Sequence, residues 1–161
     1  MRAWAEAHDV EYFADFHQFR DWSDTIAHDY LFSILNFKIL PASMLDAPNV
    51  CAINYHDAPL PKYAGSHACA WALHNRETTR GIIGHVMTND VDAGDIVRQV
   101  TFSIADDDTL DRLNQKCYLA AMRAFRAMLP DLKTETFACI PQDLSQRTFY
   151  TRAQYPPLPE A

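Results

Sequence analysis

The sequence contains 161 residues, of which 48% are hydrophobic and 22% are charged. This length and composition are typical of one globular domain and exclude a disordered, collagen-like or disulfide-scaffold protein. Fourteen Lys and Arg against 21 Asp and Glu give a net charge of −7, and without a basic stripe we expect no nucleic-acid partner. No apolar run reaches the roughly 18 residues of a membrane span, and the N-terminus lacks the apolar core of a secretory signal. We therefore expect a cytoplasmic protein that does not associate with membranes.

Helical and strand patterns alternate along the chain. The apolar run over 28–35 is rich in aromatic and branched residues, which is typical of a strand covered on both faces, as in a parallel sheet. The expected elements are helices over 2–8, 22–27, 42–45, 67–73 and 110–129, and strands over 10–13, 28–35, 49–54, 81–87 and 96–104. This alternation predicts an α/β protein with a mostly parallel open sheet flanked by helices.

The chain shows no linker, repeat or low-complexity segment. The helical pattern weakens from residue 130, and the proline-rich end is not expected to fold. We therefore expect one domain over 1–150, followed by a tail over 151–161.

The four glycines all lie between residues 65 and 94. A dinucleotide-binding or P-loop fingerprint needs glycines soon after the first strand, so both are excluded. Because glycine disfavours order, a chain with few glycines tends to keep them where the backbone needs freedom. The window from 54 to 95 is therefore where we expect a functional site.

The four cysteines, Cys51, Cys69, Cys117 and Cys139, stand far apart and form no C-x-x-C pair. Metal clusters and redox dithiols usually show close spacing, whereas an isolated cysteine often serves as an apolar core residue. We expect four reduced structural thiols and no bound metal.

Asn54 and His56 stand two residues apart at the end of a predicted strand. Strand alternation places both side chains on one face, and ligands of open α/β sheets bind beyond the carboxyl ends of the strands. An amide that donates hydrogen bonds and an imidazole that moves protons would then share one cleft. A histidine near a strand end is more often a hydrogen-bonded structural residue, so this pair alone leaves both interpretations open.

The acidic turn over 89–95 carries three carboxylates, a pattern that is ordinarily a solvated turn. It would be functional if one carboxylate reached His56, because a carboxylate beside an imidazole orients it for proton transfer. Gly94 would permit the tight backbone that aims Asp92 inward.

Four ordered segments over roughly residues 28–120 resemble the folate-dependent formyltransferase family. The segment 52–65 is similar to the family's N-x-H-x-x-x-L-P-x-x-x-G motif. The other matching segments are 29–34 with 39–41, 81–87 with 92–96, and 108–110. Within the family, the chain most resembles formyltransferase domains of nonribosomal peptide and polyketide assembly lines, on segments 56–58, 71–73, 114–118 and 142–145.

This resemblance implies a Rossmann-like formyltransferase fold and transfer of a formyl group from 10-formyltetrahydrofolate, a donor co-substrate, to an amine. The acceptor would be a small-molecule or carrier-bound intermediate of natural-product biosynthesis, such as an amino acid, an aminoacyl carrier or an amino sugar. Other assembly-line domains would then be further partners. Two alternatives stay open: a formyltetrahydrofolate hydrolase, and a non-catalytic remnant that serves as an interaction module.

The family's catalytic residues would fall on Asn54, His56 and Asp92. Asn54 would hold the oxyanion of the tetrahedral intermediate, and such a donor contributes on the order of 10²–10³ in rate. His56 would stabilise the same charge and move protons. Asp92 would orient His56 and accept the proton of the amine, directly or through water.

Further residues are implied in the folate pocket and in support of the catalytic residues. The residues implied to bind the pterin are Phe37, Ile39, Leu40, Thr88, Asn89, Asp90 and Val91. For the first three, a plain core role is an equal alternative. His85 and Gly94 would support the catalytic residues, and a buried hydrogen-bonded structural role is the alternative for His85.

The resemblance begins inside the second strand–helix unit of the family, so we expect an N-terminally truncated formyltransferase fold. In family members the opening loop commonly helps to hold the acceptor, so its absence would affect acceptor binding. The sequence leaves the oligomeric state open, although an unpaired strand would favour a homodimer.

Overall fold

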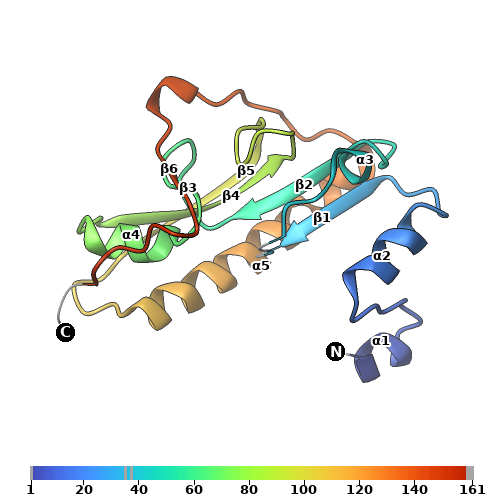
Figure 1. The fold of residues 1–161 in the computed structure, drawn as a ribbon, viewed down its shortest axis with the longest axis horizontal. Coiled ribbons are helices and arrows are strands. Elements are labelled where there is room, and N and C mark those ends of the chain that lie inside the picture. The colour runs from blue at the N-terminus through green and yellow to red at the C-terminus, as the bar shows by residue number, and fades with distance from the viewer. Residues whose placement is uncertain (1, 35, 37, 159–161) are drawn as a thin grey trace.

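The computed structural model describes residues 2–34, 36 and 38–158 (Figure 1). Its elements in chain order are α1 (Arg2–Ala7), α2 (Phe16–Ser23), β1 (Tyr30–Ile34), α3 (Ala42–Leu45), β2 (Cys51–His56), β3 (Ala64–Gly65), α4 (Ala68–His74), β4 (Thr79–Val86), β5 (Ile96–Ser103), α5 (Leu110–Thr134), a 3-10 helix (Leu144–Gln146) and β6 (Phe149–Tyr150). In the described residues, no helix combines the length and the apolar character needed to cross a bilayer.

Four strands form an open sheet in the order β1-β2-β4-β5, and β3 pairs with β6 separately. The α/β class and the helix-flanked open sheet are therefore confirmed. The expected parallel direction is found between β1 and β2 and between β3 and β6, whereas β4 is antiparallel to both β2 and β5. The link over 87–95 is shorter than the dozen or more residues of a parallel crossover, so β4 and β5 form a hairpin.

The core lies between the sheet and α5, which runs along the sheet in Figure 1. Ile53, Tyr55 and Ile82 from the sheet pack with Leu113 and Met128 from the helix. Small residues on the same face of α5 bring the helix close to the strands; they are Cys117, Ala120, Ala121 and Ala124. This packing holds β2 and β4, the two strands that carry the site, in a fixed register.

Two N-terminal predictions are wrong. Residues 10–13, all described, form no strand: Val10 and Tyr12 are 49% and 38% exposed, and Phe13 packs against Phe19 and Trp22 of α2 rather than against another strand. The second helix spans Phe16–Ser23 rather than 22–27, because Asp15 caps it by accepting hydrogen bonds from the amides at positions 17 and 18.

The long helix α5 continues past the predicted end at residue 129. Pro130 lies inside it, yet the helix reaches Thr134. Leu132 is buried in the core, and its carbonyl accepts a hydrogen bond of 2.9 Å from the hydroxyl of Tyr30. Tertiary packing thus stabilises a last turn that the weakening sequence pattern does not indicate.

The tail over 151–158 contains no helix or strand but packs against α4. Trp71 Nε1 donates to the carbonyl of Gln154 at 3.3 Å, and His74 Nδ1 lies 2.9 Å from the carbonyl of Pro157. Pro156 is fully buried. The described part of the tail is therefore ordered against the domain, contrary to the expectation that it does not fold.

Candidate active site

The end of β2 presents the first two predicted site residues on one face. Asn54 is half-buried and His56 is buried, while Tyr55 between them points into the core, where its hydroxyl lies 3.8 Å from Met128 Sδ. The alternation expected of a strand is thus realised. Both polar side chains point away from the main core.

The antiparallel register of β2 and β4 sets His85 directly opposite Asn54. Asn54 Nδ2 lies 3.2 Å from His85 Nε2, and His85 Nδ1 lies 2.9 Å from the carbonyl of Val86. A carbonyl can only accept, so the proton in this contact is on Nδ1. The ring is therefore fixed with Nε2 toward the site. His85 thus contacts Asn54 directly and also lies beside Asp92.

Asp92, on the loop between β4 and β5, lies at the centre of the site and is only 8% exposed. Its Oδ1 is 3.3 Å from His85 Nε2 and 3.4 Å from Asn54 Nδ2. Its Oδ2 accepts a 2.8 Å hydrogen bond from the amide of Gly65 and lies 3.6 Å from His56 Nδ1. We call Asn54, His56, His85 and Asp92 the Asp92 network.

The electrostatics of Asp92 follow from these contacts. Burial by itself raises the pKa of Asp92, but the hydrogen bond from His85, the nearby imidazole of His56 and the amide of Gly65 outweigh burial and hold the pKa at about 2. Asp92 is therefore ionised at neutral pH and provides a fixed negative charge between two imidazoles.

His56 is held on both sides of its ring. Its Nε2 donates to the carbonyl of Tyr63 at 2.8 Å, and its Nδ1 faces Asp92. A second carboxylate, Asp57, lies 4.0 Å from the same Nδ1. The ring orientation is thus determined before any substrate arrives, as a preorganised catalytic group requires.

Two glycines allow the backbone to approach closely around Asp92. A Cβ at Gly94 would lie 1.9 Å from the carbonyl oxygen of Val86, and a Cβ at Gly65 would lie 2.2 Å from that of Tyr150. Asp92 itself adopts a left-handed backbone with φ of 53°. Glycine at these two positions is what permits the loop geometry that places the carboxylate.

The C-terminal segment braces the loop that carries Asp92. Gln142 Nε2 donates to the carbonyls of Asp92 and Gly94 at 3.1 and 2.6 Å, and Arg147 Nη2 donates to the carbonyl of Val91 at 2.8 Å. No sequence pattern predicted a role for Arg147, and Gln142 entered only as part of a resemblance. Neither residue belongs to a motif whose chemistry would have indicated this bracing role.

A cleft of about 410 Å³ adjoins the network. Three predicted folate-binding residues line it, together with Ala93 and three residues that the sequence analysis did not foresee. Its lining is Asn89, Asp90, Val91, Ala93, Leu144, Arg147 and Phe149. Val91, Leu144 and Phe149 give it an apolar surface, and Arg147 supplies a charge beside the ring of Phe149. The cleft thus combines apolar side chains with a few polar groups, as ligand pockets commonly do.

The other predicted folate residues lie elsewhere. Ile39 is 76% exposed, so the alternative that it is a plain core residue is wrong. Leu40 is buried beside Leu31 and Met44, as the core alternative expects. Thr88 is exposed and donates to the carbonyl of Asp90. Phe37 lies outside the described residues.

Comparison with known proteins agrees with this arrangement. The family model for formyl transferase matches residues 18–129. The chain belongs to the formyltransferase family, which confirms the assignment made from its motifs. The finer resemblance to assembly-line domains stays a prediction.

Solved structures share the fold at low sequence identity. WlaRD, a sugar 3N-formyl transferase, is 19% identical with a TM-score of 0.76, over 95% of this chain and 53% of that one. An N-formyltransferase from Helicobacter canadensis is 20% identical with a TM-score of 0.76, over 94% and 54%. HypX from Aquifex aeolicus is 15% identical with a TM-score of 0.74, over 89% and 25%. The chain thus spans about half the length of the first two proteins.

Proposed function

We propose that this chain transfers a formyl group from 10-formyltetrahydrofolate to the amine of a small biosynthetic intermediate. The observation that carries the proposal is the buried contact of Asn54 and His56 with Asp92, within a chain of the formyltransferase family. The WlaRD structure was determined with dTDP and 5-N-formyl-THF, and the Helicobacter canadensis structure with folinic acid and dTDP-3-aminofucose. These relatives support a folate donor.

The same two relatives bear on the choice of acceptor. Among an amino acid, an aminoacyl carrier and an amino sugar, they favour an amino sugar linked to a nucleotide. We therefore propose this acceptor class first, ahead of a carrier-bound intermediate.

The amine attacks the formyl carbon that the folate donor supplies. The new C–N bond forms as the bond from that carbon to the folate nitrogen breaks, and the proton lost by the amine goes to the departing tetrahydrofolate. Asn54 Nδ2 is the amide donor at the half-buried edge of the network, so we assign it to the oxygen on which negative charge develops. His56 stands next to it on the same face of β2 and adds a second polar group toward that charge. Both groups are fixed by Asp92, so little reorganisation accompanies the reaction.

The low pKa of Asp92 refines its role. A general base works best when its pKa lies near the operating pH, and a carboxylate with a pKa of about 2 is a weak base at neutral pH. We therefore assign Asp92 to holding the two imidazoles by charge and hydrogen bonding, ahead of accepting the proton of the amine.

The first experiment is calorimetric binding of folinic acid to the purified chain and to Asp92→Ala. Binding by the wild type that the variant weakens would support the folate site beside the Asp92 network. A correctly folded chain that binds no folinic acid would favour the non-catalytic module.

The second experiment measures formyl transfer to dTDP-amino sugars, with formate release in the absence of amine measured in parallel. We expect Asn54→Ala to lower the rate by about 10²–10³. His8→Gln is the matched surface control, because His8 is exposed on the turn after α1. Formate release without amine, and no transfer with it, would favour the hydrolase.

A further inference from the structure

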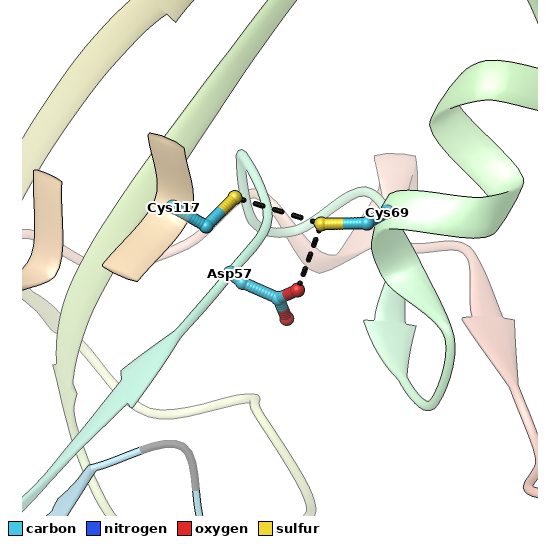
Figure 2. Close-up of side chains that lie close together, drawn as sticks. All are labelled: Asp57, Cys69 and Cys117. Carbon is cyan, nitrogen blue, oxygen red and sulfur yellow. Dashed lines mark hydrogen bonds between the residues drawn. The ribbon is translucent and has the colours of Figure 1, made fainter. Parts of the chain in front are cut away.

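A second polar cluster lies next to the Asp92 network and is not used in the formyl transfer proposed above. Asp57 directly follows His56, Cys69 is on α4 and Cys117 is on α5 (Figure 2). Cys69 Sγ lies 3.1 Å from Asp57 Oδ2 and 3.5 Å from Cys117 Sγ. We call Asp57, Cys69 and Cys117 the thiol cluster. Both cysteines are buried, whereas the Asp57 side chain is 28% exposed and connects the cluster to solvent.

Arg80 on β4 adds a fully buried guanidinium to this cluster. Its Nη2 is 3.7 Å from Cys69 Sγ and 3.9 Å from Asp57 Oδ2. Its Nε and Nη1 have no hydrogen-bond partner among the described residues. A buried hydrogen-bond donor without an acceptor lowers the stability of the fold, and a charged donor lowers it more. A neutral thiol accepts only weakly, and the Asp57 carboxylate at 3.9 Å is beyond hydrogen-bonding distance, so the donors of Arg80 are incompletely satisfied.

We propose that Asp57, Cys69 and Cys117 bind a Zn²⁺ ion. Zinc takes thiolate and carboxylate ligands at about 2.3 Å and 2.0–2.2 Å, mostly in tetrahedral geometry. Such bond lengths place two sulfurs about 3.8 Å apart, close to the 3.5 Å between Cys69 and Cys117. All three ligand atoms already lie within 4.8 Å of one another. The two sulfurs therefore need to separate by only about 0.3 Å to take up the ion.

The charges of the occupied site balance. Two thiolates and one carboxylate contribute three negative charges, and Zn²⁺ with Arg80 contributes three positive charges. Binding releases the protons of the two thiols and turns both sulfurs into strong acceptors. Cys69 Sγ, which Arg80 already approaches, then becomes a better partner for the guanidinium.

A disulfide between Cys69 and Cys117 would explain fewer features of the thiol cluster than a bound Zn²⁺ ion does. It would use only the two sulfurs and would remove the thiol that donates to Asp57. It would add no negative charge beside Arg80. The carboxylate in contact with Cys69 and the incompletely paired guanidinium of Arg80 therefore favour a cation over a disulfide.

The test is metal uptake by the whole chain under thiol reductant, with Zn²⁺ measured against a chromophoric chelator and Co²⁺ used as a spectroscopic probe. We expect one Zn²⁺ per chain, a raised Tm, and a thiolate-to-Co²⁺ charge-transfer band. Cys69→Ser and Cys117→Ser should lose that band. Cys51→Ser and Cys139→Ser are the matched controls and should keep it, because neither cysteine belongs to the cluster.

Two variants extend the test beyond the cysteines. Asp57→Asn should weaken Zn²⁺ binding and leave the charge-transfer band in place, since both sulfurs remain. Arg80→Met should weaken binding by about 10–100-fold, as loss of a supporting contact to a metal ligand does. A reduced, folded wild type that binds no Zn²⁺ would overturn the proposal. So would an unchanged Co²⁺ spectrum in the Cys69→Ser/Cys117→Ser chain.

Discussion

Two polar clusters meet at the end of β2, one at His56 and the other at Asp57, and they differ in how well their hydrogen-bonding groups are matched. Within the described residues, the four side chains of the Asp92 network contain no buried nitrogen or oxygen without a partner. Beside the thiol cluster, Arg80 has two such nitrogens. A fully matched network is rigid and preorganised, whereas an unmatched one needs a ligand to complete it.

The two clusters also differ in how their charges are arranged. In the Asp92 network, a carboxylate is enclosed by the amide of Gly65, two imidazoles and the side chain of Asn54. In the thiol cluster, the guanidinium of Arg80 has a weakly accepting sulfur at 3.7 Å and a carboxylate at 3.9 Å, and two of its nitrogens have no partner. The first arrangement is suited to stabilising charge that develops during a reaction. The second is suited to a bound cation whose binding converts the two thiols to thiolates.

The largest expected effect is on catalysis in the Asp92 network. Asp92→Asn keeps the shape of the side chain but removes the charge that fixes both imidazoles, so we expect kcat/KM to fall by about 10²–10⁴. Steady-state formyl-transfer kinetics measure this change. Asp106→Asn, on the exposed turn before α5, is the matched control. A wild-type rate in Asp92→Asn would remove Asp92 from the proposed mechanism.

The next effect is on stability, through the backbone that places Asp92. Gly94→Ala would set a Cβ 1.9 Å from the carbonyl oxygen of Val86, so the loop must shift, and we expect a loss of about 3 kcal/mol. Gly84→Ala is the matched control, since its Cβ would meet nothing closer than 3.4 Å. Denaturant unfolding of both variants measures the difference. Equal stability of the two would show that the loop tolerates a side chain at position 94.

Whether an element of this fold could be predicted depends on whether the residues that determine it lie close together in the sequence. The strands over 49–54 and 81–87 and the long helix are local patterns, so the sequence indicated them to within a few residues. The direction of β4 is not local, because it depends on how a chain of more than twenty residues returns to β2. The end of α5 is fixed by Tyr30, over 100 residues away, which no window of sequence contains.

The same distinction applies to the site. Asn54 and His56 share a strand end, and the motifs that resemble the formyltransferase family pointed to Asp92. The direct contact of His85 with Asn54 and Asp92 required the antiparallel register of β2 and β4. The thiol cluster was missed because its cysteines are 48 residues apart, and only the packing of α4 against α5 brings them together.

A smaller effect concerns acid stability of the Asp92 network. Asp92 has a folded-state pKa of about 2, below the ordinary value of 3.8, so its charge stabilises the fold above that ordinary pKa. This contribution, about 2 kcal/mol, is lost as the pH falls toward the folded pKa. The difference in unfolding free energy between wild type and Asp92→Asn should therefore shrink between about pH 5 and pH 2. A difference that stays constant over this range would show that the carboxylate is not held in its charged form.

The smallest expected effect is the change in stability on replacing Arg80, and it tests the difference between the two clusters most directly. Arg80→Met removes a buried charge whose donors are incompletely matched, so the metal-free chain should be as stable as wild type or more stable by about 1 kcal/mol. Loss of a matched group should act in the opposite sense, so His85→Leu, which leaves Asp92 without one of its donors, should destabilise the chain. Denaturant unfolding in the presence of a chelator compares the two. If Arg80→Met were strongly destabilising without metal, the guanidinium would already be satisfied in the free chain, and the contrast between the clusters would fail.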